Sequence, residues 1–71
     1  MTRYLCIGGR RHGTAVELHD APWTIELDGQ GYRRVEWWHL SRPVMLYVQH
    51  RACVSATEIT ELIRKFQSGG L

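Results

Sequence analysis

The sequence predicts a small α+β domain, in which an antiparallel sheet of four or five strands is packed by one C-terminal helix. The first observation behind this prediction is the stretch 32–67. It contains two apolar runs, YRRVEWWHL and VMLYVQHRACV, followed directly by the helical pattern SATEITELIRKFQ. The second observation is the length, since 71 residues are too few to form two separate cores. Residues 1–71 are therefore predicted to form a single domain.

Five strands are expected, at residues 3–8, 14–19, 23–28, 32–39 and 44–53. The first is apolar and aromatic and runs into a glycine-rich segment, GGRRHG, which we interpret as an exposed loop. The second and third alternate apolar and polar side chains. Pro22 separates these two strands, because proline cannot donate to a β-ladder. Asp28-Gly29 is a strong hairpin signal ahead of the fourth strand.

The fourth and fifth strands are expected to form a β-hairpin whose register follows from its side chains. A four-residue loop, 40–43, places Trp37 opposite Leu46 and Val35 opposite Val48, which gathers apolar side chains on one face. A shift of one residue would mix apolar and polar side chains on both faces. The other face then carries Arg34, Glu36, Trp38, Met45, Tyr47 and Gln49. That face is unusually apolar for one in contact with solvent.

A helix is expected over residues 56–67. Ser55 is a good N-cap, and Glu58 three residues later completes a capping box. One buried stripe, spaced i, i+3, i+4 and i+7, is formed by Ile59, Leu62, Ile63 and Phe66. This stripe and the apolar face of the hairpin each need a partner, so the core is expected to lie between sheet and helix.

The composition indicates a globular chain without a membrane segment. The first apolar run, residues 4–7, is too short for a signal peptide, and nothing approaches the roughly 20 apolar residues of a membrane span. We therefore expect a cytoplasmic location and no membrane partner. In a reducing cytosol Cys6 and Cys53 would stay thiols, with a disulfide between them as the alternative left open.

No pattern of catalytic or metal-binding residues is apparent. The four histidines and two cysteines contain neither a CxxC nor an HxxxH, so no metal and no cofactor are expected. A Cys–His nucleophile would need an orienting group and an oxyanion site, whereas both cysteines lie in apolar strands where thiols are usually inert. The carboxylates are spread over separate strands. We therefore expect that the protein is not an enzyme.

Basic residues suggest a site for an anion or a nucleic acid. The net charge of +2 is too small to indicate nucleic-acid binding by itself. However, arginines interleave with aromatic residues, as they do in proteins that hold single strands, and GGRRHG has the glycines of a small anion nest. The candidate residues are Arg10, Arg11, His12, Arg33 and Arg51.

The apolar outward face of the hairpin suggests a protein interface. Trp, Tyr, Met and Arg are the usual anchors of such surfaces, and the candidate residues are Trp38, Met45, Tyr47 and Arg34. Two interpretations stay open. The face binds a larger partner or a second copy in a homodimer, or the N-terminal strands fold over it and bury it internally.

The N-terminus carries a family resemblance. The run Tyr4-Leu5-Cys6-Ile7-Gly8-Gly9, then His12-Gly13 and the strand 16–18, resembles the opening of small, mostly uncharacterised phage and prophage proteins. Those begin with a YxCIGG…G strand–turn–strand and continue with a tyrosine-bearing hairpin. The resemblance covers residues 4–18 and transfers no site residue.

This resemblance implies a phage accessory protein that acts in the host cell by binding, for example by blocking a host defence complex. We therefore expect a non-catalytic binding protein that inhibits or modifies a host macromolecule. The alternatives are a module that binds single-stranded nucleic acid and a small-ligand sponge with a pocket between protomers.

Overall fold

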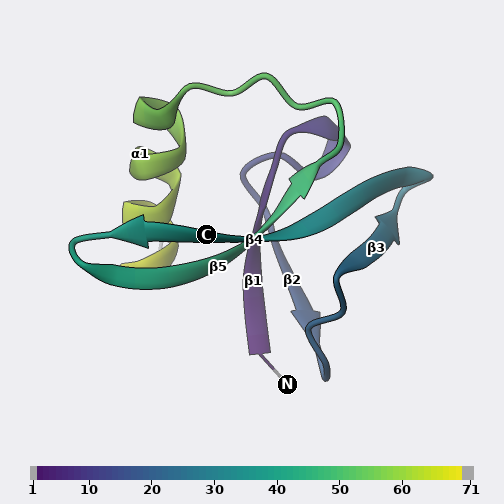
Figure 1. The fold of residues 1–71 in the computed structure, drawn as a ribbon, viewed down its shortest axis with the longest axis horizontal. Helices are drawn as coiled ribbons and strands as arrows, with labels where there is room; N and C mark the ends of the chain where they lie inside the picture. Colours follow the sequence, from purple (N-terminus) through teal and green to yellow (C-terminus); the bar gives the residue numbers. More distant parts are fainter. Residues whose placement is uncertain (1, 70–71) are drawn as a thin grey trace.

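The computed structural model describes residues 2–69, which form a five-stranded sheet and one C-terminal helix (Figure 1). The elements are β1 (Thr2–Ile7), a short 3-10 turn (Gly9–Arg11), β2 (Ala15–Leu18), β3 (Thr24–Leu27), β4 (Gln30–His39), β5 (Arg42–Gln49) and α1 (Ala56–Gln67). The predicted α+β class is confirmed.

The sheet has the strand order β2-β1-β5-β4-β3 and is mixed. Three of its pairings are antiparallel, but β1 runs parallel to β5, with Leu5 opposite Leu46 and Ile7 opposite Val48. The sheet was expected to be antiparallel throughout, which is wrong for this one pair. Strands joined by tight turns must be antiparallel, whereas β1 and β5 are far apart in the chain and no turn fixes their relative direction.

The hairpin of β4 and β5 closes through a two-residue turn, so the predicted four-residue loop is wrong. Leu40 and Ser41 both have positive φ, 52° and 63°, as in the turns that match the twist of a hairpin. Trp37 therefore lies opposite Val44 instead of Leu46. Residues 40 and 41 are Leu-Ser and lack the Asn-Gly or Asp-Gly signal typical of such a turn. Because this register differs by two residues from the predicted one, the same side chains remain on each face.

The helix α1 covers one face of the sheet and spans the predicted residues. Its N-cap is Ser55, whose Oγ accepts a hydrogen bond from the Glu58 N–H at 3.2 Å. The connection to α1 begins earlier than expected, because β5 ends at Gln49 and residues 50–53 form a turn and loop. The core on this face consists of Leu5, Ile7, Leu46, Ile59 and Ile63, with Trp37, Val44, Val48, Val54, Leu62 and Phe66 packed around them.

A second core lies on the other face of the sheet. Its fully buried members are Cys6, Tyr32 and Tyr47, which come from the three central strands. Val16 and Leu18 of β2 and Ile25 and Leu27 of β3 pack against them. Since β2 and β3 are the two edges of the sheet, they can share these contacts only if the sheet curls. The curl of the sheet therefore creates a second hydrophobic core, in a chain that is too short to form one large core.

Candidate functional site

The hairpin projects beyond the rest of the sheet. β3 pairs with β4 only as far as Arg33, and β1 pairs with β5 only from Leu46 onward. Residues 35–45, here called the arm, are therefore two-stranded, and Figure 1 shows them extending away from the other strands beside α1. Trp37 and Val44 pack one face of the arm against the core beneath the helix. The opposite face has no such cover.

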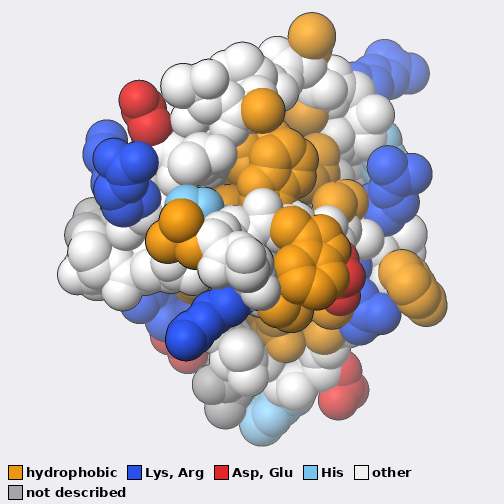
Figure 2. Space-filling model, turned by 60° about the vertical axis from the view of Figure 1, so that its left-hand side comes forward, with side chains coloured by type: hydrophobic (Ala, Val, Ile, Leu, Met, Phe, Trp, Pro, Cys, Tyr) orange, Lys and Arg blue, Asp and Glu red, His pale blue; other side chains and the backbone are white. Residues whose placement is uncertain are grey.

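That opposite face of the arm is formed by the cross-strand pairs Trp38–Pro43 and Glu36–Met45, and we call these four residues the open face. Trp38 is 65% exposed and Met45 37% exposed, and Leu40 in the adjoining turn is 82% exposed. Figure 2 turns this side of the molecule forward and shows hydrophobic side chains at the surface among Lys and Arg side chains. An exposed apolar group of this kind, bordered by charge, is typical of an interaction site.

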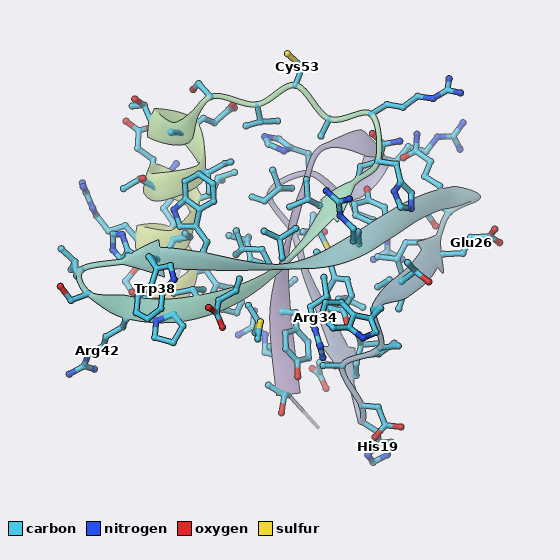
Figure 3. All side chains as sticks on the ribbon, viewed as in Figure 1. His19, Glu26, Arg34, Trp38, Arg42 and Cys53 are labelled. Atoms are coloured by element: carbon cyan, nitrogen blue, oxygen red, sulfur yellow. The ribbon has the colours of Figure 1, made fainter. Side chains whose placement is uncertain are left out.

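The base of the hairpin is covered. Tyr47 is fully buried, and its hydroxyl donates to the Pro22 carbonyl oxygen at 2.8 Å. Arg34 donates to the carbonyl oxygen of Ala21, and its guanidinium carbon lies 4.3 Å from the ring centroid of Trp23. Of the predicted interface residues, Tyr47 and Arg34 are thus held by the segment between β2 and β3. Trp38, labelled in Figure 3, stays at the surface, and so does Met45.

A second exposed tryptophan, Trp23, begins the strand predicted at residues 23–28. Trp23 alternates with Ile25 and Leu27, yet it is 70% exposed. β3 begins only at Thr24, and Trp23 lies at the end of the sheet where its ring stacks on Arg34. The adjacent Pro22 was the available signal, because a proline marks the place where a strand has to end or begin.

Two of the predicted anion-binding side chains, Arg11 and His12, already contact carboxylates of the same chain. Arg11 Nε lies 2.8 Å from Asp28 Oδ2, and this hydrogen bond raises the pKa of Arg11. Nδ1 of His12 accepts a hydrogen bond from the Gly8 N–H at 2.7 Å, and Nε2 of the same ring lies 3.3 Å from Glu58 Oε1. A neutral ring in this setting carries its proton on Nε2. Glu58 therefore contacts His12, whereas the predicted capping box would direct its carboxylate to the Ser55 N–H.

The backbone of GGRRHG is engaged as well. The Gly8 N–H donates to His12 Nδ1, and the Arg10 N–H donates to Gln30 Oε1. The Arg11 N–H donates to the Tyr32 hydroxyl, and the Gly13 N–H donates to the Cys6 carbonyl. A nest binds an anion through free backbone N–H groups. Most of the donors that such a nest would use here already hold the loop to β4 and to the rest of the chain.

The remaining basic candidates gather at the end of the sheet opposite the arm. Arg10 lies in the short 3-10 turn after β1, where its N–H donates to Gln30 Oε1 at the start of β4. Arg33 lies in β4 beside β3, and Arg51 follows the end of β5. Their side chains make no hydrogen bond or ion pair with residues 2–69. The aromatic residues that interleave with the arginines in the sequence offer no exposed ring beside these three. Tyr32 and Tyr47 are buried, Trp37 packs beneath α1, and Trp38 is on the arm.

The two cysteines are free thiols in different environments. Burial raises the pKa of Cys6 to about 11, although the charge of Arg11 offsets part of that effect, so the thiol is protonated at neutral pH. Cys53 is exposed in the loop before α1 and points away from the molecule (Figure 3). Within residues 2–69, no group of three His, Cys, Asp or Glu side chains is placed to hold a metal ion.

No family model matches this chain, and comparison with curated proteins and with solved structures found no match. In the part of the chain that the structure describes, no helix has the length and apolar character needed to cross a membrane. The function must therefore be inferred from the chemistry of the surface itself.

Proposed function

We propose that this protein is a non-catalytic protein-binding module that contacts its partner through the open face. The observation that carries the proposal is the position of Trp38, 65% exposed on a projecting arm. Tryptophan offers a large apolar area with few rotatable bonds and is enriched among the residues that dominate binding energy. A partner that covers Trp38 removes this area from water.

The arm is well suited to present such a side chain. Trp37 and Val44 fix its other face against the helical core, so the arm has little freedom to lose when a partner binds. Met45 on the same face is unbranched and can adapt to the shape of a partner. Arg42 beside the turn is exposed and adds a charge at the outer end of the arm (Figure 3).

The class of partner is part of the proposal. The resemblance of residues 4–18 to phage proteins supports a host protein or protein complex as the target. Binding then inhibits or modifies the target by occupying its surface, as in the blocking of a defence complex.

Affinity capture tests this function with a matched pair of tryptophan variants. Wild type, Trp38→Ala and Trp23→Ala would be immobilised and exposed to bacterial host lysate. Both tryptophans are largely exposed, so neither substitution removes a buried side chain, but only Trp38 lies on the open face. We expect wild type and Trp23→Ala to retain the same protein. Trp38→Ala should bind it at least about thirtyfold more weakly. Equal capture by all three proteins would contradict the proposal.

A second candidate, binding of single-stranded nucleic acid, is favoured by one observation. Arg10, Arg33 and Arg51 lie at one end of the sheet without side-chain partners in residues 2–69. Phosphate contacts predict an affinity for an oligonucleotide that falls steeply with salt, and a smaller salt slope when one of these arginines is replaced by alanine. Absence of binding at low salt would eliminate this candidate, and Trp38→Ala should not alter it.

A further inference from the structure

We propose that the outer edge of β4, at Glu36 and Trp38, binds an extended segment of the partner, which adds to the sheet as a further strand. This inference rests on the proposed function, because the partner is the same. It adds the manner in which the partner is held. In β-strand addition the main-chain hydrogen bonds supply affinity, and alternate side chains supply specificity.

The direction of the backbone groups follows from two hydrogen bonds. The Arg34 N–H donates to the Trp23 carbonyl at 2.8 Å, so it points away from β5 toward β3. The His50 N–H donates to the Gly31 carbonyl, so Gly31 points toward β5. Backbone direction alternates with a period of two along a strand. The N–H and C=O groups of Glu36 and Trp38 therefore point outward, at positions that β3 does not reach.

The corresponding edge of β5 is not available to a strand. From Leu46 onward β1 covers it. Nearer the turn, Pro43 occupies an outward-pointing position and has no N–H to donate. Proline at such a place is a common device against strand pairing. The free edge of β4 has no proline, and its residues 35–39 are all extended.

The geometry of this edge favours a separate segment over a second copy of the chain. Antiparallel pairing of two arms centred on Trp37 would put Leu40 of one copy opposite Arg34 of the other, where Trp23 already lies. Pairing centred on Glu36 would place the Glu36 carboxylates of the two copies opposite each other, where they repel. A centre at Trp38 sets Glu36 against the turn, where Leu40 is not extended.

The side chains of the edge define the chemistry of the segment. Glu36 and Trp38 lie on the same face, and Glu36 has no ion-pair partner in residues 2–69. Residues opposite them on an added strand also share a face and stand two positions apart. The segment should therefore carry a basic residue opposite Glu36 and an apolar residue opposite Trp38.

A displayed library of random peptides provides the probe. Peptides would be selected on the full chain, and one would be added to isotope-labelled protein while the exchange of individual backbone amides is followed. We expect selected peptides with a basic and an apolar residue two positions apart, and protection of the Glu36 and Trp38 amides on binding. Glu36→Pro removes an outward N–H without touching the β4–β5 hydrogen bonds, and should weaken peptide binding about tenfold. Glu36→Gln keeps that N–H and should weaken it less than about fivefold.

The outcomes separate this inference from the proposed function. A peptide that needs Trp38 but leaves the Glu36 and Trp38 amides unprotected overturns strand addition and leaves the binding surface intact. If the peptide protects the backbone amides of residues 36 and 38 equally in wild type and in Trp38→Ala, strand addition is supported. The same result counts against the open face as the binding surface. Protection that rises with protein concentration and needs no peptide identifies a second copy as the occupant and overturns the inference. A library that yields no binder overturns it too.

Discussion

The hydroxyl of Tyr32 donates to the carbonyl oxygen of Gly8 at 2.8 Å, and so joins the middle of the sheet to the glycine-rich loop. The hydroxyl oxygen of Tyr32 also accepts a hydrogen bond from the Arg11 N–H at 3.0 Å. A single buried tyrosine hydroxyl thus satisfies one acceptor and one donor of this loop. The glycine-rich loop, which has the sequence of a small anion nest, is therefore hydrogen-bonded to β4 through Tyr32.

Tyr32→Phe should lower the free energy of unfolding by about 1–3 kcal/mol, because it leaves the Gly8 carbonyl and the Arg11 N–H without their partner. Urea unfolding followed by tryptophan fluorescence measures the change. Tyr4→Phe is the matched control, since the Tyr4 hydroxyl has no hydrogen bond in residues 2–69 and its ring contacts Tyr47 through an edge. Equal losses in the two variants would contradict the assigned role of the Tyr32 hydroxyl.

Gly8→Ala should destabilise the fold far more than Gly29→Ala. Both glycines have positive φ, 80° and 77°, so both substitutions strain the backbone. For Gly8, whose ψ is 166°, this region is essentially restricted to glycine, and the backbone cost is about 1–3 kcal/mol. A Cβ on Gly8 would also lie 2.4 Å from the Cβ of Ala52, whereas a Cβ on Gly29 meets nothing within 4 Å. The clash should add about 1–3 kcal/mol to the loss for Gly8→Ala. Thermal or urea unfolding of the two variants gives this difference, and similar losses would refute the close approach.

Cys6 should make the free energy of unfolding depend on pH in the alkaline range and not below it. Burial raises the pKa of this thiol from 9.0 to about 11. Below pH 9 the folded and unfolded chains both keep the proton, so the group contributes no pH dependence. Above pH 9 the unfolded chain loses the proton first, and the free energy of unfolding falls as the pH rises toward 11. Cys6→Ala should flatten this decline, and an unchanged slope would show that other groups cause it.

Ser55→Ala should cost about 1 kcal/mol, because the Ser55 Oγ is the acceptor that caps the Glu58 N–H. Thr57→Ala, at an exposed position in the first turn of α1, is the control and should be close to neutral. Glu58→Ala separates the two possible roles of the Glu58 side chain, since glutamine could still complete a capping box. If the carboxylate contacts His12, as the 3.3 Å distance indicates, the losses for Glu58→Ala and Ser55→Ala should add. A loss for Glu58→Ala that disappears in a Ser55→Ala background would instead support the full capping box.

Local patterns were sufficient for the helix. Ser55 and the stripe from Ile59 to Phe66 predicted its residues correctly, because caps and a 3.6-residue period depend on neighbours in the chain. The faces of the hairpin were also predicted correctly. Its register was not, because a two-residue shift conserves the faces and so leaves no trace in the apolar pattern.

The candidate surface was only partly predictable. Trp38 and Met45 are exposed, a point that the sequence left open, whereas Tyr47 of the same face is buried and Trp23 is not. Both differences depend on the segment before β3, which crosses the base of the hairpin and bonds to Tyr47 and Arg34. No spacing within the hairpin contains that information.

The sequence by itself determined which residues form the helix, which side chains share each face of the hairpin and that the fold is α+β. These properties follow from periodicity and capping, which act over a few residues. Only the tertiary structure decided that β1 lies parallel to β5, that the sheet curls around Tyr32 and Tyr47, and that the arm extends past both neighbouring strands. Those properties depend on contacts between segments far apart in the chain, and they leave Trp38 and the outer edge of β4 open.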